Sequence, residues 1–324
     1  MNQIVRHLKS SRRVFLASHI QPDGDAIGSL LALGLSLARL NIRTALFNES
    51  HIPAVYRFLP GVTAITRRFD SQAGFDTAVI LDCGSLERIG AAAAAVGRLP
   101  TIINVDHHVT NTGFGHLQLI DTSACSTAEI VFRLIKQLAT PIDKAVATAI
   151  YTGILTDTGS FRFANTSSAA FSICDEMVRR GVIPSEVAQH VYGTYSMGRI
   201  KLLNLALDSI EISPNGKLSL MTLTRHMLRE TNTLPEDADG IINYAKRIQD
   251  VRVAVLIQEN GNGDSPSTDR ARRFHVSLRS DGTVDVAAIA AAFGGGGHCN
   301  AAGFNIQADL DELKSKIFNL AQKI

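Results

Sequence analysis

Several features that define whole classes of proteins are missing from this sequence. No apolar run approaches the roughly 20 residues of a membrane-spanning helix, and the longest run near the N-terminus, at 30–40, is interrupted by Ser36 and Arg39. Residues 1–13 are polar and basic, so we expect no secretory signal. No internal repeat is visible. These absences favour a cytoplasmic protein that does not enter a membrane.

Cysteine and excess charge are also scarce. The four cysteines, Cys83, Cys125, Cys174 and Cys299, have no paired spacing, which argues against a disulfide framework or a zinc-thiolate site. The net charge is only +2, whereas proteins that track long nucleic acids usually carry a strong basic excess. The composition therefore allows a small anionic substrate and does not indicate a long DNA partner.

What the chain does contain is an apolar fraction of 45% over 324 residues, enough for two domains with sizeable cores. In the first half, strand-like runs alternate with helix-like runs. The expected strands are 13–18, 43–47, 77–81 and 101–105, and the expected helices are 25–40, 126–138, 144–155 and 167–180. This alternation predicts an α/β domain with a mainly parallel sheet covered by helices on both faces. Ligands of such sheets bind beyond the C-terminal ends of the strands.

The second half predicts a smaller α/β domain. A helical connector is expected at 191–209, which divides the chain into domains at 1–190 and 210–324. Strands are expected at 217–223, 251–258 and 274–279, with helices at 237–247 and 286–293. Residues 259–269 are polar and rich in Gly, Ser and Pro, which is typical of an exposed loop.

The turn after the first predicted strand carries the strongest chemical signal. It places His19, Asp23 and Asp25 directly before or at the start of a predicted helix. Carboxylates and imidazoles together suit a divalent ion such as Mn²⁺, and the N–H groups at the start of a helix can face an anion. A polar loop whose aspartates cap the helix is the alternative interpretation. An EF-hand is excluded because the twelfth position from Asp23 is Gly34, and the G-x-G-x-x-G dinucleotide spacing is absent.

Two further groups of ionisable residues follow predicted strands. Asp82 comes directly after the apolar run 78–81, and Asp106, His107 and His108 follow the strand at 101–105. Taken alone, Asp82 is explained better as a helix cap than as a ligand. Three consecutive ionisable residues at a strand end are harder to explain as solvated surface, and a turn with incidental histidines is the alternative.

Asp157 lies at the end of a predicted helix, within a Thr-Asp-Thr-Gly segment. A simple helix end, with Gly159 as the stop residue, is one interpretation. A carboxylate at the negative end of a helix dipole is unfavourable by itself. The position of Asp157 therefore makes sense if a cation lies nearby.

A glycine tract near the C-terminus is the last signal. Four glycines at 294–297 precede His298, and small residues follow. Such a tract could be a flexible linker. Predicted structure flanks it on both sides, however, and bare backbone lets amide groups approach a phosphate closely. We therefore expect a phosphate-binding segment.

The order of these motifs resembles the DHH phosphoesterase family with a DHHA1 C-terminal domain. The motifs are His-x-x-Pro-Asp-Gly-Asp, a strand-end Asp, Asp-His-His, Thr-Asp-Thr-Gly and Gly-Gly-Gly-His-x-x-Ala-Ala-Gly, spread over nearly the whole chain. The length and the lack of extra modules resemble the stand-alone NrnA-type members. Those are nanoRNases (oligoribonucleases) that often also act as phosphatases on 3′-phosphoadenosine 5′-phosphate (pAp).

The resemblance implies a centre with two divalent ions in the domain at 1–190. His19 and Asp23 would hold one ion, Asp25 and His107 the other, and Asp82 and Asp157 would serve the shared site, with Asp82 bridging. Close carboxylates repel each other, and two divalent ions would balance the four of this set. The imidazoles favour Mn²⁺, with Mg²⁺ or Co²⁺ as alternatives.

The resemblance also implies catalytic and substrate-binding roles. Asp106 would support the metal ligands from behind, and His108 would contact the scissile phosphate or assist proton transfer. In the DHHA1 domain at 210–324, the other phosphate would be bound by Arg279, Ser280, Gly295, Gly296, Gly297 and His298. The active site would then lie in a cleft between the domains, with the connector as a hinge.

The expected function is exonucleolytic hydrolysis of oligoribonucleotides a few residues long to 5′-mononucleotides, and of pAp to AMP. Cyclic di-nucleotides, or linear dinucleotides such as pApA and pGpG, are alternative substrates because all would share the metal site. RecJ-like exonucleases carry additional strand-binding modules and inorganic pyrophosphatases have a different C-terminal domain, so both are disfavoured. A catalytically idle nucleotide sensor is the alternative from another class. A homodimer is expected from the resemblance alone.

Overall fold

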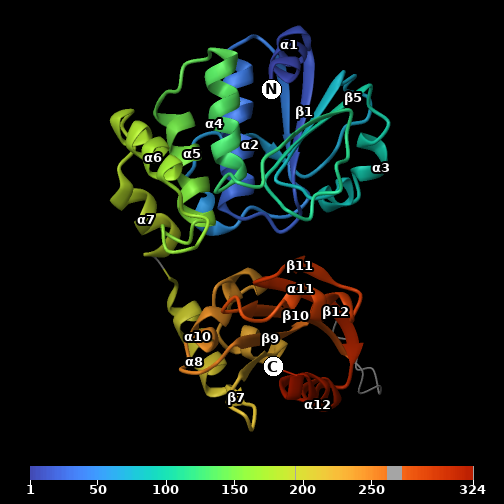
Figure 1. Ribbon diagram of the computed structural model, residues 1–324, viewed down its shortest axis with the longest axis vertical. Helices are drawn as coiled ribbons and strands as arrows, with labels where there is room; N and C mark the ends of the chain where they lie inside the picture. The colour runs from blue at the N-terminus through green and yellow to red at the C-terminus, as the bar shows by residue number, and fades with distance from the viewer. Residues whose placement is uncertain (194, 261–271, 324) are drawn as a thin grey trace. The chain divides into compact units, whose positions relative to one another are not determined.

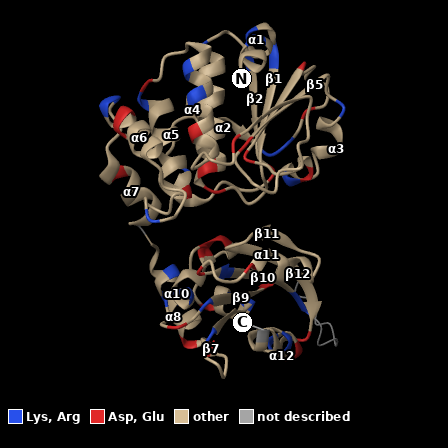
Figure 2. Ribbon diagram, in the orientation of Figure 1, with Lys and Arg blue, Asp and Glu red and all other residues tan. Residues whose placement is uncertain are grey.

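The computed structural model describes residues 1–193, 195–260 and 272–323. The chain forms two compact units, Met1–Thr194 and Tyr195–Ile324, each built around a sheet of its own (Figure 1). Within the described residues, no helix is long and apolar enough to cross a membrane. Lys and Arg are interspersed with Asp and Glu along both units (Figure 2), in agreement with the small net charge of +2.

The first unit contains a six-stranded sheet in the order β3-β2-β1-β4-β5-β6, in which every neighbouring pair is parallel. Its strands are β1 (Arg13–Ser18), β2 (Arg43–Phe47), β3 (Ile65–Thr66), β4 (Thr77–Leu81), β5 (Thr101–Asp106) and β6 (Leu117–Ile120). The central strands β1, β4 and β5 are buried along almost their whole length. Continuous apolar runs are what a parallel sheet covered on both faces requires. The predicted fold of this half is confirmed.

Helices cover one face of this sheet, and a short helix and several turns cover the other. The helices are α1 (Asn2–Ser10), α2 (Gly24–Ala38), α3 (Ala93–Val96), α4 (Thr127–Leu138), α5 (Lys144–Asp157), α6 (Ser168–Arg179) and α7 (Pro184–Tyr192). Figure 1 shows α2, α4 and α5 together on one side of the sheet, and they contact one another. The opposite face packs around an aromatic cluster centred on Phe15, with α3 alongside.

Two glycines allow close contacts between these helices. A Cβ atom added to Gly28 on α2 would lie 2.4 Å from the carbonyl oxygen of Ala149, and one added to Gly153 on α5 would lie 2.6 Å from the Cβ of Ala128. Side chains at these positions would push α2, α4 and α5 apart. Because Asp25 lies in the first turn of α2 and Asp157 ends α5, this close packing also positions two acidic residues.

The second unit contains a mixed six-stranded sheet in the order β11-β12-β10-β9-β8-β7, in which β8 and β9 are parallel and the other neighbours are antiparallel. Its strands are β7 (Glu211–Ile212), β8 (Leu218–Leu223), β9 (Val253–Asn260), β10 (Arg272–Ser280), β11 (Gly296–His298) and β12 (Ala301–Ala308). Its helices are α8 (Met197–Asp208), α9 (Arg225–Glu230), α10 (Ile242–Lys246), α11 (Val286–Ala291) and α12 (Leu310–Leu320). Separate apolar clusters form on the two faces of the sheet, as expected for the smaller α/β half.

Some local predictions for this half need correction. The helix expected at 237–247 is a 3₁₀ turn, Pro235–Ala238, followed by the short α10, and Gly240 between them has φ +81°. The glycine tract forms part of a hairpin in which β11 pairs with β12, so the alternative of a flexible linker is excluded. The connector expected at 191–209 comprises the end of α7 and all of α8, and α8 belongs to the second unit. Of the loop expected at 259–269, the first two residues continue β9 and the rest lies outside the described residues.

Candidate metal centre

The predicted metal ligands come from four segments of the first unit. His19, Asp23 and Asp25 follow β1, Asp82 follows β4, His107 follows β5, and Asp157 is the last residue of α5. In the strand order, β1 lies between β2 and β4, so the order of strands along the sheet reverses at β1 and β4. Such a switch point, at the carboxyl ends of parallel strands, is where α/β sheets bind ligands.

The ligand atoms of these residues approach one another closely enough to share metal ions. Three sets have potential ligand atoms within 4.8 Å of one another, namely His19, Asp23 and Asp82; Asp25, His107 and Asp157; and Asp82, His107 and His108. All six predicted ligands are therefore brought together, and His108 joins them. The first set contains His19 and Asp23, and the second contains Asp25 and His107, the two pairs that the family resemblance assigns to separate ions. The cluster could bind metal ions.

Backbone carbonyls orient the two ligand imidazoles. Nδ1 of His19 lies 2.9 Å from the carbonyl oxygen of Ile20, and Nδ1 of His107 lies 3.4 Å from that of Ala124. A carbonyl only accepts, so Nδ1 is the donor in both contacts and Nε2 is the nitrogen that would face a metal ion. Nε2 of His19 faces Asp82 at 3.5 Å, and Nε2 of His107 faces Asp157 at 3.6 Å. This tautomer suits metal binding through Nε2.

The N-terminus of α4 holds two of the carboxylates, a contact that the motifs did not predict. Asp25 is 1% exposed and accepts hydrogen bonds from the backbone N–H groups of Thr127 (2.6 Å) and Ala128 (2.8 Å). The hydroxyl of Thr127 also donates to Asp82 at 3.0 Å. Amide groups at a helix start stabilise negative charge. The sequence signal for this helix start is the capping pattern from Ser126 to Glu129, but that pattern does not show which carboxylate it meets.

His108 is held by a buried carboxylate. Its Nδ1 donates to Asp106 at 2.6 Å, and Asn111 donates to the other oxygen of Asp106, which is fully buried. Burial alone would lower the pKa of His108, but the hydrogen bond to Asp106 and the negative charge of Asp82 outweigh it and raise the pKa to about 9. Before any metal ion binds, His108 is therefore a cation at neutral pH.

The carboxylates of the cluster do not titrate normally without a counter-ion. Burial and the nearby charges of Asp82 and Asp157 raise the pKa of Asp25 well above its ordinary value. Burial and the charges of Asp23 and Asp82 do the same for Asp157. Burial also acts on Asp82, but its hydrogen bond with His19 and three imidazole charges reverse the direction and lower its pKa. Crowded carboxylates with raised pKa values are the expected state of a cation site before cations balance it.

Backbone strain and a supporting amide also mark the site. Asp82 has φ +57°, and Ser160 and Phe161, just after Asp157, have φ +61° and +62°. These are left-handed backbone conformations that residues other than glycine rarely adopt. They occur often at functional sites. The Asn165 amide donates to the carbonyl oxygen of Asp157 at 3.1 Å and to its carboxylate at 3.4 Å. Sequence reasoning did not identify Asn165.

The predicted phosphate-binding residues lie on the second unit. Arg279 on β10 and His298 on β11 are both paired with Ala301 of the strand between them, so all three lie on one face of the sheet. Burial lowers the pKa of Arg279, and the charge of Asp239 opposes this. Ser280 differs, because it is 1% exposed and its hydroxyl accepts hydrogen bonds from the N–H groups of the following turn.

The glycines of the tract have unequal surroundings. A Cβ atom on Gly295 would lie 2.2 Å from the carbonyl oxygen of Gly303, and Gly297 has φ +145°. Gly296 has nothing within 4 Å of such an atom. Gly295 and Gly297 therefore allow the tight packing of the hairpin, and Gly296 presents open backbone beside His298.

An all-parallel α/β unit with a carboxylate and imidazole cluster at its switch point, followed by a unit with a mixed sheet, defines the class of protein. It is a two-unit α/β protein whose first unit could bind metal ions. The model of the N-terminal domain of the DHH family matches residues 13–154, and the model of the DHHA1 domain matches residues 220–323. The chain belongs to the DHH family and carries a DHHA1 domain.

Relatives match over nearly the whole length. The chain is 30% identical to the bifunctional oligoribonuclease and PAP phosphatase NrnA of Thermus thermophilus, over 96% of this chain and 89% of that protein. It is 25% identical to the protein of the same name from Bacillus subtilis, over 94% and 92% of the two chains. Among solved structures, an exopolyphosphatase-related protein from Bacteroides fragilis matches with a TM-score of 0.90 and 27% identity, over 99% and 95% of the two chains.

Proposed function

We propose that the protein is a metal-dependent phosphoesterase that hydrolyses short oligoribonucleotides to 5′-mononucleotides and pAp to AMP. The relatives named for these two activities match over almost the entire chain. The observation that carries the proposal is the convergence of six separate side chains, from four segments, on one cluster at the switch point of the sheet.

Two divalent ions, most consistent with Mn²⁺, would be held by His19, Asp23, Asp25, Asp82, His107 and Asp157. The donor set supports this, because two imidazoles among four carboxylates suit Mn²⁺ better than Mg²⁺. When bound, such ions would neutralise the carboxylates, activate a water molecule and stabilise charge on the phosphoryl oxygens.

His108 and Asp106 would act on the substrate side of this centre. The hydrogen bond from Nδ1 of His108 to Asp106 fixes the ring and favours the imidazolium. An imidazolium can bind a phosphoryl oxygen or give a proton to the leaving oxygen. Asp106 contacts His108 and Asn111 rather than the reacting atoms, so we assign it a positioning role.

The second unit would bind the other phosphate of the substrate. Arg279 and His298 lie on one face of the sheet, and the exposed Gly296 and Gly297 supply backbone beside them. We propose that residues 1–190 act as the metal domain, 191–209 as the connector and 210–324 as the substrate domain. Ser280, buried in its turn, would position Arg279 rather than touch the ligand. A homodimer stays a prediction.

A hydrolysis panel with purified protein and Mn²⁺ tests the proposal. The substrates are a 5′-phosphorylated RNA dinucleotide, longer RNA, pAp, a cyclic di-nucleotide and pyrophosphate. Preference for the dinucleotide, together with release of phosphate from pAp, is the expected result. Preference for the cyclic di-nucleotide would replace the proposed substrate. If the metal-loaded protein hydrolyses none of the nucleotides, enzymatic function is contradicted and a nucleotide sensor is indicated.

A further inference from the structure

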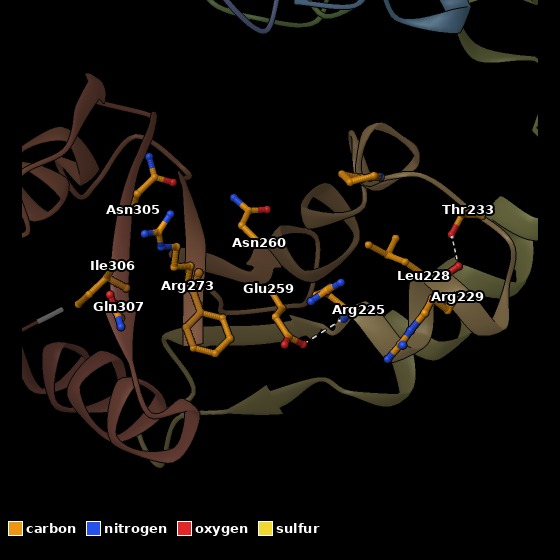
Figure 3. A pocket seen from close by; sticks show the side chains of 12 residues that line it. Arg225, Leu228, Arg229, Thr233, Glu259, Asn260, Arg273, Asn305, Ile306 and Gln307 are labelled. Atoms are coloured by element: carbon orange, nitrogen blue, oxygen red, sulfur yellow. Dashed lines mark hydrogen bonds between the residues drawn. The ribbon is translucent and has the colours of Figure 1, made fainter. Parts of the chain in front are cut away.

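A polar cavity lies in the second unit, away from the predicted phosphate-binding residues. Its volume is about 780 Å³, and it is bounded by the end of β9, the start of β10, the end of β12, α9 and the turn at Pro235. Figure 3 shows Arg273 and Asn305 on one side, Arg225 and Leu228 on the other, and Asn260 between them. Pockets that hold nucleotide-sized ligands have volumes of about 300–1,000 Å³.

Positive charge predominates among the described residues that line this cavity. Three guanidinium groups line it, those of Arg225, Arg229 and Arg273, against one carboxylate, Glu259. That carboxylate already has partners, since it accepts from the backbone N–H of Arg225 at 3.1 Å and from the guanidinium of Arg272 at 3.3 Å. The described lining therefore favours an anion over a cation.

Neutral donors and apolar surface complete the cavity. Asn260, Asn305 and Gln307 contribute side-chain amides, and Leu228 and Pro235 contribute apolar wall. The amide oxygen of Asn305 lies 2.9 Å from Nδ1 of His275, which leaves the NH₂ group of Asn305 as its donor. A ligand with phosphate, polar edges and a flat apolar face would match these three kinds of surface.

The cavity and the Arg279 site are separate places on one sheet. Arg273 and Arg279 are both on β10 and six positions apart, so their side chains leave the same face of the sheet. At about 3.3 Å per residue, they are about 20 Å apart along the strand. A single phosphate cannot contact both.

We propose that this cavity is a second binding site, which takes the phosphate of a nucleotide-sized ligand independently of the metal centre. Two sources would supply the same chemistry. One is a free mononucleotide, and the other is a distant phosphate of an oligonucleotide whose nearer phosphate is bound at Arg279. At a rise of about 3.4 Å per nucleotide, about six stacked nucleotides span this distance. The second source rests on the proposed function, whereas the first does not.

Binding of 5′-AMP to the full chain with Mg²⁺, followed by amide chemical shifts in NMR spectra, tests the site itself. We expect shifts at Asn260, Phe274 and Gln307. Arg273→Gln should weaken this binding by about tenfold or more, as for the loss of a charge-assisted hydrogen bond to phosphate. Gln307→Glu should also weaken it, by repulsion. Arg247→Gln, an exposed arginine of the same unit outside the cavity, is the control and should bind as the parent does.

The proposal is overturned if 5′-AMP shifts none of these amides, or if Arg273→Gln and Gln307→Glu both bind it as Arg247→Gln does. Hydrolysis then separates the two sources. A fall in kcat/KM of Arg273→Gln that is larger for RNA of about eight nucleotides than for a dinucleotide supports the substrate's own phosphate. If Arg273→Gln loses 5′-AMP binding but its kcat/KM values for the two RNA lengths keep the parental ratio, a free mononucleotide is the supported ligand. A protein that binds 5′-AMP in the cavity but hydrolyses no substrate would keep this inference and contradict the proposed function.

Discussion

The candidate metal centre of the first unit and the glycine hairpin of the second unit are built in opposite ways. In the first unit, His19, Asp25 and Asp82 of the cluster are buried, and its side chains are fixed by helix starts, backbone carbonyls and one another. In the second, His298 and its neighbouring glycines are exposed on a short hairpin. Chemistry on a phosphate needs ligands held within fractions of an ångström, whereas recognition of varied nucleotides tolerates an open surface. A fixed cluster in one unit and an exposed hairpin in the other suit a protein whose first unit carries out the chemistry and whose second unit binds the substrate.

Loss of one carboxylate from the cluster of the first unit should have the largest effect on turnover. Asp157→Asn keeps the shape of the side chain but loses the charge opposite Nε2 of His107. We expect turnover on every substrate to fall by at least about a thousandfold, as when a group needed in the transition state is lost. Initial rates with dinucleotide RNA and with pAp measure this, together with the number of bound ions.

Asp175→Asn is the matched control, because Asp175 is an exposed carboxylate paired only with Arg179 among the described contacts. Its rates should equal those of the parent. Parental rates in Asp157→Asn would contradict the metal assignment.

The sequence predicted this site better than the surroundings that fix it. Strand-end positions of Asp82 and His107 can be predicted because continuous apolar runs define β4 and β5. The amide groups of α4 that hold Asp25 cannot, because Thr127 is 102 residues away in the sequence and no local pattern links them. The edge strand β6 was missed for another reason, since its partly exposed residues form no apolar run. Local patterns fix elements, and long-range contacts fix the geometry of the site.

Overfilling the contact between α2 and α5 should give the next largest effect. In Gly153→Ala, the new Cβ would lie 2.6 Å from the Cβ of Ala128 and 2.9 Å from Oδ1 of Asp25. Overpacking costs about 1–3 kcal/mol of stability, and here the displaced group is a ligand. We expect a lower melting temperature and reduced turnover, with unchanged KM. An unchanged melting temperature and full activity would show that the close contact is not needed.

Removal of metal should destabilise the first unit in a pH-dependent way. Asp25, Asp157 and His108 all have raised pKa values in the folded protein. A group whose pKa is higher in the folded than in the unfolded protein stabilises the fold at a pH below its unfolded pKa. That stability is lost as the pH rises through its folded pKa. The pKa of Asp82 is lowered instead, so its contribution to stability has the opposite pH dependence. That contribution is lost only below about pH 4.

Protein in EDTA should therefore melt at a lower temperature near pH 8 than near pH 5.5, and Mn²⁺ should restore more stability near pH 8. Thermal melts at both pH values, with and without Mn²⁺, measure this difference. Higher stability of the metal-free protein near pH 8 would mean that the carboxylates do not repel one another as the geometry indicates.

Changes in the second unit should affect binding more than chemistry. His298→Ala should raise KM for short phosphorylated substrates by about tenfold, the value of one charge-assisted hydrogen bond, with a smaller change in kcat. Cys299→Ser, in the same exposed turn, is the control. A fall in kcat without a change in KM would move His298 from recognition into the chemistry.

The smallest effect should come from Ser280→Ala. This variant distinguishes the role that the family resemblance predicts for Ser280 from the role that its local contacts indicate. The resemblance predicts a ligand contact, whereas its buried hydroxyl accepts from the N–H of Gly282 at 3.0 Å and from that of Val284 at 3.3 Å. Loss of such a turn should cost about 0.5–1.5 kcal/mol of stability, which denaturant unfolding of the full chain measures. If Ser280→Ala raises KM as strongly as His298→Ala while stability stays unchanged, the hydroxyl must leave its turn to reach the ligand. If stability falls and KM follows only weakly, Ser280 acts through the position of Arg279, and the open site also depends on a small rigid support.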